Sequence, residues 1–231
     1  MAAAEGGGLK PVKWLLDLIY PPKCVLCGRL LQKDEENACP RCLLELPILT
    51  VLLDGGDFYS ACAAPFRYEG KLRESILRYK FGCKRHYAQF YAEYLAASIQ
   101  AQLDGKYDLI TWVPISRRRR RERGYDQART LAELTAKRLG CPCVQTLKKT
   151  KHNRRQSGID SDEARRANVK GVYRAVKPER FAGKRLLLID DIITTGSTIS
   201  ECAFTLRRAG ASGVAAAVTA AARAPKTTVS R

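Results

Sequence analysis

The strongest hydrophobic pattern in the chain lies between Arg185 and Gly210. Leu186–Ile189 is an uninterrupted apolar run without the two-residue alternation of a half-exposed strand. Such a run is typical of a strand that is buried on both faces of a parallel sheet. After a short polar turn, apolar residues recur at the spacing of one helix face, and Gly210 ends that helix. They are Ile199, Cys202, Ala203, Leu206 and Ala209.

Similar patterns predict that helices and strands alternate along most of the chain. Apolar residues have helical spacing over about Lys10–Tyr20, Lys71–Lys80, Tyr87–Leu103 and Tyr125–Leu139. Short apolar runs predict strands over Phe58–Arg67, Tyr107–Pro114, Val169–Arg174 and Val214–Val218. At 231 residues, the chain can hold one α/β domain with a parallel sheet flanked by helices, plus a small appendage.

Two carboxylates and a run of hydroxyl groups follow the buried strand. Asp190 and Asp191 come first, and Thr198 and Glu201 have the spacing of a capping box, which predicts a helix start near Thr198. The backbone N–H groups and the positive dipole end of a helix start form a site for phosphate. The acid pair suits a divalent cation or the hydroxyls of a ribose. The pattern therefore indicates a sugar phosphate. The turn residues are Thr194, Thr195, Gly196, Ser197 and Thr198.

The segment LLLIDDIITTGST resembles the 5-phosphoribosyl-1-pyrophosphate (PRPP) motif of type I phosphoribosyltransferases. Two acids, then a TTGST loop between a strand and a helix, form a longer pattern than a lone glycine-rich turn. The competing interpretation is a strand, turn and helix with incidental acids. That interpretation leaves two adjacent charges unexplained at the carboxyl end of a buried strand, where open α/β sheets place their ligands.

The charge of the chain indicates anionic partners. Lys and Arg outnumber Asp and Glu by 41 to 23, which gives a net charge of +18 and favours polyphosphates, nucleic acid or both. Six of the seven residues 117–123 are arginine. We expect them to form a loop over the carboxyl edge of the sheet, where guanidinium groups could hold a pyrophosphate. Solvated surface charge and a nucleic-acid arm are the alternatives. Lys80, Lys84, Arg85 and His86 form a basic corner, which is either a solvated face or one wall of an anion site.

Four of the nine cysteines form two Cys-x-x-Cys pairs, Cys24 with Cys27 and Cys39 with Cys42. Eleven residues separate the pairs, and four thiolates at this spacing suit tetrahedral Zn²⁺. Because the protein supplies all four ligands, we expect a structural site. A redox dithiol could explain either pair alone, but not both. The other cysteines are expected to be packing residues, although Cys141 and Cys143 could be oxidisable.

The domain boundaries follow from these patterns. We expect a disordered N-terminus at 1–8, a helix and zinc module at 9–50, a phosphoribosyltransferase-like domain at 51–222 and a basic tail at 223–231. The polar segment Lys148–Lys170 predicts a lid or a disordered loop. We expect a cytoplasmic protein without membrane insertion, because no apolar run reaches about 18 residues and the N-terminus lacks the pattern of a signal peptide.

From about Pro22 onwards, the chain resembles the ComF family of competence-type proteins, which pair a four-cysteine zinc module with a type I phosphoribosyltransferase domain. The resemblance rests on several ordered segments. They are the two Cys-x-x-Cys pairs, RYKFG at Arg78–Gly82, VPISRRRRRERGYDQ at Val113–Gln127, TKHNRRQSG, EARRANVKGVY and the PRPP motif.

The resemblance implies roles for individual residues. Asp190 and Asp191 would hold the ribose hydroxyls and Mg²⁺, and Thr194–Thr198 would cradle the 5-phosphate. Pro114, Ile115 and Ser116 occupy the position of the pyrophosphate loop, with Arg123 nearby as a catalytic residue. Lys148–Asn168 would be the flexible catalytic loop. Asp126 departs from the family, where many relatives are expected to carry Asn, and it would add a negative charge to the basic loop.

Three functions are compatible with these patterns. The first is transfer of a phosphoribosyl group from Mg²⁺–PRPP with release of pyrophosphate, in nucleotide metabolism or natural competence. The second is binding of single-stranded DNA during its uptake, aided by tyrosines such as Tyr79, Tyr87 and Tyr125 and by other competence proteins. The third is regulation by PRPP binding without turnover. The acceptor substrate stays open.

Overall fold

The computed structural model describes residues 21–150 and 171–222. The chain divides into two compact units, Met1–Leu46 and Pro47–Arg231. Several expectations lie outside the described residues: the disordered N-terminus, the helix over Lys10–Tyr20, most of the Lys148–Lys170 segment and the basic tail. Within the described residues, no helix has the length and apolar character that crossing a membrane requires.

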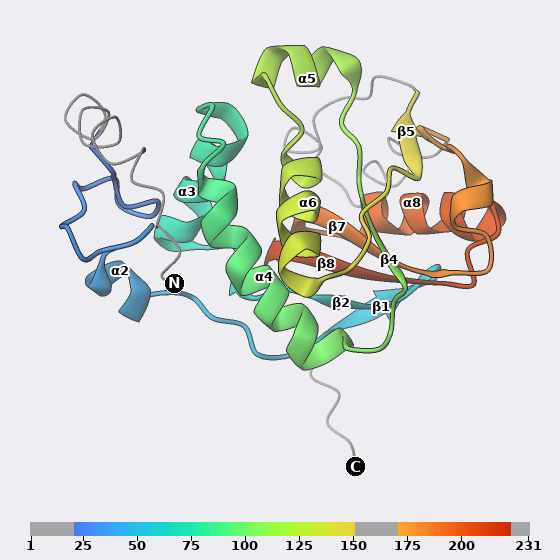
Figure 1. Cartoon of the computed structure of the whole chain (residues 1–231), viewed down its shortest axis with the longest axis horizontal. Coiled ribbons are helices and arrows are strands. Elements are labelled where there is room, and N and C mark those ends of the chain that lie inside the picture. The colour runs from blue at the N-terminus through green and yellow to red at the C-terminus, as the bar shows by residue number, and fades with distance from the viewer. Residues whose placement is uncertain (1–20, 151–170, 223–231) are drawn as a thin grey trace, which may run out of the picture. The chain divides into compact units, whose positions relative to one another are not determined.

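The second unit is built on one mainly parallel sheet (Figure 1). Its strands lie in the order β1-β2-β8-β7-β4, and β3 also pairs with β8. All pairs are parallel except the hairpin of β1 with β2. A separate antiparallel pair is formed by β5 and β6. The bounds are β1 Leu53–Gly56, β2 Tyr59–Ala63, β3 Phe66–Arg67, β4 Leu109–Trp112, β5 Leu147–Lys149, β6 Tyr173–Ala175, β7 Arg185–Ile193 and β8 Gly213–Ala221.

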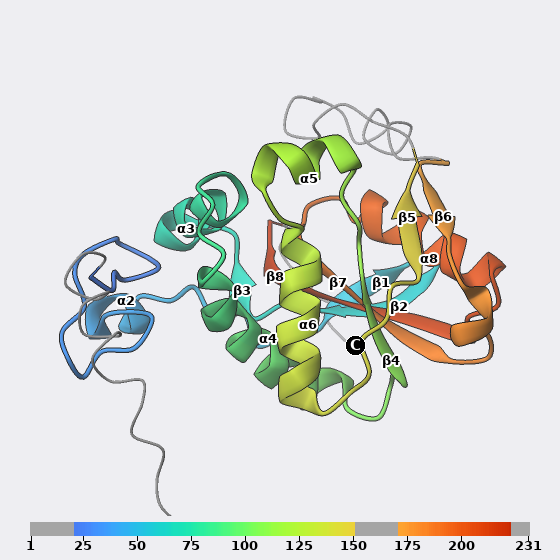
Figure 2. The ribbon, with the colours of Figure 1, turned by 45° about the horizontal axis from the view of Figure 1, so that its top comes forward.

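Helices cover both faces of this sheet (Figures 1 and 2). One face carries α4 and α6, which pack on each other and on β4, β7 and β8, and the opposite face carries α8. This layered arrangement confirms the expected α/β fold class. The bounds are α3 Gly70–Phe81, α4 Tyr87–Leu103, α5 Arg117–Arg123, α6 Gln127–Leu139, the 3₁₀ turn η2 Pro178–Arg180 and α8 Ser197–Arg208; in the first unit, α2 spans Pro40–Leu44.

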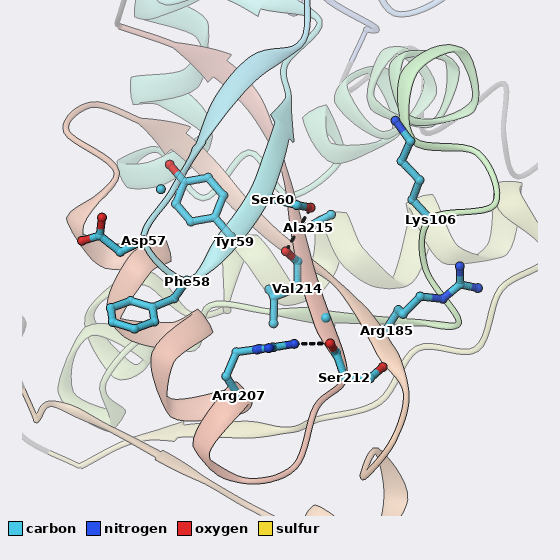
Figure 3. Close-up of a pocket in the computed structure, with 12 residues that line it drawn as sticks. Asp57, Phe58, Tyr59, Ser60, Lys106, Arg185, Arg207, Ser212, Val214 and Ala215 are labelled. Atoms are coloured by element: carbon cyan, nitrogen blue, oxygen red, sulfur yellow. Dashed lines mark hydrogen bonds between the residues drawn. The ribbon is translucent and has the colours of Figure 1, made fainter.

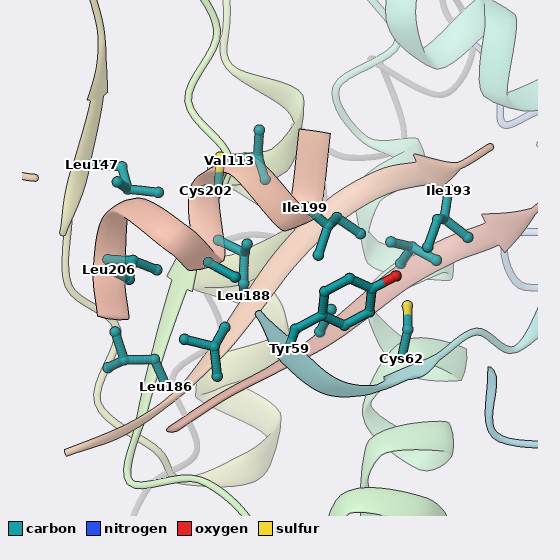
Figure 4. Close-up of a cluster of buried hydrophobic side chains, with 14 of the residues drawn as sticks. Tyr59, Cys62, Val113, Leu147, Leu186, Leu188, Ile193, Ile199, Cys202 and Leu206 are labelled. Atoms are coloured by element: carbon teal, nitrogen blue, oxygen red, sulfur yellow. The ribbon is translucent and has the colours of Figure 1, made fainter. Parts of the chain in front are cut away.

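The central strand β7 is buried on both sides, as its sequence predicts. Leu186 and Leu188 pack against Ile199 and Leu206 of α8 (Figure 4). Successive strand residues point to opposite faces, so Leu187 and Ile189 face the α4 and α6 layer. All four β7 side chains are fully buried. Since burial of one such side chain stabilises a fold by about 1.5–3 kcal/mol, this strand is a major source of stability.

Two details of the central motif differ from the sequence expectations. The strand does not stop before the acids, because β7 pairs with β8 as far as Ile193 opposite Ala221. The helix starts close to Thr198, as expected, but the capping box is wrong: α8 begins at Ser197, with Gly196 as the residue before its first turn and no side-chain cap. Instead of capping the helix, the Glu201 carboxylate accepts a hydrogen bond from the Gly171 backbone N–H at 2.6 Å.

The arginine run also differs, because it forms a helix, α5, and not a loop. Arginine has a high helix propensity. The side chain of Ser116 accepts a hydrogen bond from the Arg119 backbone N–H at the start of α5, and Gly124 ends the helix in the left-handed conformation at φ 76°. Both boundary signals stand in the sequence, one at each end of the arginine run.

Candidate functional site

The register of β4 and β7 assembles the predicted site. Trp112 pairs with Ile189, and the Val113 backbone N–H donates to the Ile189 carbonyl at 2.9 Å. The next residues of the two strands are therefore Pro114–Ser116 on one side and Asp190–Asp191 on the other. Both segments lie toward the carboxyl edge of the sheet, Pro114–Ser116 after the end of β4 and Asp190–Asp191 within the last part of β7, although more than 70 residues separate them in the sequence.

The hydroxyl turn lies directly at the start of α8. Gly196 has φ 79°, and a Cβ atom added there would lie 2.9 Å from the Tyr59 hydroxyl. Both the positive φ and the close approach require glycine. The Oγ1 atom of Thr195 lies 2.9 Å from the Oγ atom of Ser197, so the two hydroxyls share a hydrogen bond. The turn thus presents hydroxyl groups beside the N-terminus of a 12-residue helix, which is a suitable cradle for phosphate.

The two acids are close neighbours with different environments. The Asp191 backbone N–H donates to Asp190 Oδ1 at 2.8 Å, and Lys80 Nζ lies 3.0 Å from Asp191 Oδ1. Desolvation of the Asp190 carboxyl and the adjacent Asp191 charge raise the pKa of Asp190 to about 8. Oxygen ligands at a strand edge that already attract a cation fit Mg²⁺, which protein sites hold through one or two carboxylates.

Lys80 reaches the acids because a set of hydrogen bonds, which we call the clasp, joins the end of α3 to the start of α6. The Tyr79 hydroxyl donates to the Gln127 carbonyl at 2.9 Å, and Gln127 Nε2 donates to the Lys80 carbonyl at 3.3 Å. The Tyr125 hydroxyl donates to the Tyr79 carbonyl. Tyr79 is fully buried. The clasp therefore connects the RYKFG and RGYDQ segments and fixes the backbone from which Lys80 extends.

Asp126 has a structural role that the sequence did not predict. Its Oδ1 accepts from the Arg129 backbone N–H at 3.2 Å, which caps the start of α6. Its Oδ2 accepts from the Ile115 backbone N–H at 3.3 Å. Burial raises the pKa of this carboxyl, while the two amide donors oppose that shift. Asp126 thus closes the Pro114–Ser116 segment against α6, and its carboxylate does not point into the open basic surface.

Arg123 lies at the C-terminal end of α5, and its side chain contacts Gln127 and Phe81. Its NH1 donates to Gln127 Oε1 at 3.0 Å, and its guanidinium carbon lies 4.8 Å from the centre of the Phe81 ring. Among the described residues, no ion pair joins Arg123 to Asp190 or Asp191. Its assignment as a catalytic residue stays a prediction.

Lys149, at the end of β5, is a second lysine whose pKa is influenced by the charge of Asp190. Its Nζ lies 3.4 Å from the Tyr173 hydroxyl and 5.2 Å from the centre of that ring. Burial, together with the positive charge of Arg119, lowers the pKa of Lys149 to about 8, and the Asp190 charge partly offsets this shift. The sequence patterns indicated only a polar loop for Lys149 and a basic corner for Lys80. The position of Lys80 in the RYKFG segment was the signal that could have identified it.

The four paired cysteines form one cluster in the first unit. Their sulfur atoms all lie within 4.8 Å of one another, and Cys27 Sγ is 3.9 Å from Cys39 Sγ. Zn–S bonds of about 2.3 Å in a tetrahedron place the sulfurs about 3.8 Å apart. Desolvation acts to raise the pKa of Cys39, but hydrogen bonds from the Cys42 backbone and from Arg29 outweigh it and lower this pKa to about 6. This geometry fits a closed, structural zinc site.

Family comparisons agree with both units. Residues 126–230 match the family described as phosphoribosyl transferase domain, and residues 15–75 match the double zinc ribbon domain. Competence protein F of Haemophilus influenzae is 30% identical over 198 residues, which cover 82% of this chain and 80% of that protein. Competence protein ComFC of Bacillus subtilis is 24% identical over 211 residues, which cover 86% of this chain and 85% of that protein.

Other relatives match this chain over a shorter length and are described as DNA utilization proteins. DNA utilization protein YhgH of Salmonella typhi is 35% identical over 108 residues, or 46% of each chain. The full-length similarity to competence protein F, the two matched domains and the observed α/β fold with its four-cysteine cluster lead to one assignment. The chain belongs to the ComF family of competence-type proteins.

Proposed function

We propose that the carboxyl edge of the sheet binds Mg²⁺–PRPP and transfers its phosphoribosyl group to an acceptor nitrogen, with release of pyrophosphate. The observation that carries this proposal is the register of β4 and β7, which brings the Pro114–Ser116 segment beside Asp190 and Asp191. The hydroxyl turn at the start of α8 continues directly from β7. A pyrophosphate, a ribose and a 5-phosphate would then lie in succession along one edge.

The residues of the site divide the work of such a transfer. Asp190 and Asp191 would hold the ribose hydroxyls and Mg²⁺, which neutralises charge on the leaving pyrophosphate. Backbone N–H groups at the start of α8 and the hydroxyls of Thr195 and Ser197 would hold the 5-phosphate. Lys80 and the arginines of α5 supply positive charge for the pyrophosphate. Stabilisation of charge by groups that are already in place is the main catalytic effect expected here.

The acid pair provides the direct test of PRPP binding. Asp190→Asn with Asp191→Asn is expected to abolish Mg²⁺-dependent PRPP binding in isothermal titration while the thermal unfolding transition stays cooperative. Thr195→Val should weaken binding by about 1–3 kcal/mol, because one hydrogen bond to a charged phosphate is lost. Unchanged PRPP affinity in the double variant would refute the assignment.

Turnover is tested separately from binding. Wild-type protein with Mg²⁺–PRPP and a panel of nitrogenous bases should release pyrophosphate with at least one acceptor. PRPP binding without release for any acceptor would favour a regulator that senses PRPP.

Lys80 should compete with a divalent cation for Asp191. Both side chains are about 17% exposed or less, so the ion pair is shielded from solvent more than a surface pair. Lys80→Met is expected to increase Mn²⁺ affinity by about three- to tenfold, measured by electron paramagnetic resonance in the absence of PRPP. Lys84→Met, which removes an exposed lysine from the same corner, is the matched control and should leave the affinity unchanged. Equal affinities in the two variants would contradict a competing role for Lys80.

We also propose that Cys24, Cys27, Cys39 and Cys42 bind one Zn²⁺ per chain. Metal analysis of protein purified without chelator should give one equivalent of zinc, and Cys24→Ser with Cys42→Ser should lose it, because two of four thiolate ligands are removed. Cys62→Ser, at a cysteine outside the cluster, controls for loss of a thiol alone. Retention of a full equivalent by the double variant would exclude this ligand set.

Single-stranded DNA binding along α5 is a second candidate function. The observation that favours it is that Arg117, Arg118, Arg120 and Arg121 are all exposed on this helix. Replacing Arg118, Arg119 and Arg120 by Ala should reduce the salt dependence of oligonucleotide affinity. If these side chains contact phosphates, the slope of log affinity against log salt should flatten by roughly two, since each contact contributes about −0.7. An unchanged slope would mean that α5 does not contact the DNA backbone.

A further inference from the structure

A hollow lies at the amino edge of the sheet, at the opposite end of β7 from Asp190 and Asp191. It has a volume of about 590 Å³ and is bordered by the tip of the β1–β2 hairpin, the end of α8 and the first residues of β7 and β8. Arg185, the first residue of β7, is part of its wall. Asp190 lies five residues further along the strand, which corresponds to about 17 Å. The hollow therefore lies away from the acid pair, although Tyr59 in its lining also approaches Gly196 of the hydroxyl turn.

Three cationic side chains border this hollow, and Asp57 is the one acidic residue in its lining (Figure 3). Arg185 pairs with the Asp108 carboxylate. Lys106 Nζ donates to the Gln102 carbonyl at 3.1 Å, and Arg207 NH1 donates to the Ser212 carbonyl. A carbonyl orients a cation without neutralising it. Within the described residues, no carboxylate forms an ion pair with Lys106 or Arg207, so these two charges are available to an anion.

An exposed aromatic ring completes the wall of the hollow. Phe58, at the tip of the hairpin, is 40% exposed. Its ring centre lies 4.8 Å from that of Phe204, and the Arg208 guanidinium carbon lies 5.5 Å from the centre of the Phe204 ring. Packing on α8 therefore supports Phe58 from one side, while part of its surface faces solvent. Such a ring is a ready platform for a planar base.

We infer that this hollow is a second binding site, for a nucleotide unit whose phosphate lies near Arg207 and whose base packs on Phe58. The combination of oriented cations and a supported aromatic ring is the one that proteins use for single-stranded nucleic acid, and it suits a free nucleotide equally. An inorganic anion would not need the ring, and an apolar ligand would not need the cations. This site requires neither Asp190 nor Asp191, so it is independent of the proposed transferase activity.

The test compares two probes on the full-length protein. Fluorescence anisotropy with a labelled thymidine decanucleotide measures binding of a strand, and titration calorimetry with thymidine monophosphate measures binding of one nucleotide. Phe58→Ser with Arg207→Gln should weaken binding by about tenfold, given the contribution of one stacked base and one phosphate contact. Lys137→Gln, which removes an exposed lysine from the last turn of α6, is the matched control. Thermal unfolding verifies that each variant is folded.

The outcomes separate the sources of the ligand. Loss of affinity for both probes supports a site for a single nucleotide, and loss for the decanucleotide alone supports a strand that passes through the hollow. Saturating Mg²⁺–PRPP and the Asp190→Asn, Asp191→Asn variant should leave this binding unchanged. The inference is overturned if the Phe58→Ser, Arg207→Gln variant binds both probes as tightly as the Lys137→Gln control, or if only the α5 arginine variant loses affinity.

Discussion

The parallel ladder in which β7 lies between β4 and β8 is the constraint on which the rest of the structure depends. Its hydrogen-bonded register runs on the β8 side from Arg185 opposite Gly213 to Ile193 opposite Ala221. Parallel neighbours need crossover connections, so helices are brought to both faces and the ends of the strands meet at common edges. The register alone thereby places the loops after β4 and β7 beside each other.

The pKa values of charged side chains at the carboxyl edge are shifted by burial and by neighbouring charges. Asp190 has its pKa raised to about 8 by desolvation and by Asp191, whereas burial and nearby arginine lower the pKa of Lys149 to about 8. Opposite shifts of an acid and a base at one edge are typical of functional sites. Lys80 is a third charged group at this edge. The hydrogen bonds of the clasp, among Tyr79, Tyr125 and Gln127, hold the backbone from which Lys80 reaches Asp191.

The two edges of the sheet have different chemistry. The carboxyl edge combines acids with cations and the N-terminus of α8, which suits a sugar phosphate with its divalent ion. The amino edge carries cations with an exposed phenylalanine, and among the residues that line its hollow there is one acid, Asp57. The two edges lie at opposite ends of β7, with Arg185 at the amino edge and Asp190 and Asp191 toward the carboxyl edge.

Local patterns by themselves determined the elements and the chemical groups. The apolar run of β7, the helical spacing in α4 and α8, the PRPP-like turn and the four paired cysteines depend on residues close in sequence, so period and spacing revealed them. The helix α5 was also locally encoded, by Ser116 and Gly124, but the charge of the arginine run obscured its boundary signals.

Only the tertiary structure decided which side chains meet. Lys80 and Asp191 form an ion pair although they are more than 100 residues apart in the sequence, and the charge of Asp190 influences the pKa of Lys149, which lies in a separate two-stranded sheet. The role of Asp126 depends on the Ile115 backbone N–H, which is positioned by the end of β4. The amino-edge hollow joins a hairpin tip to the end of a helix. Such contacts arise from strand register and helix packing, and no pattern within a short stretch of sequence specifies them.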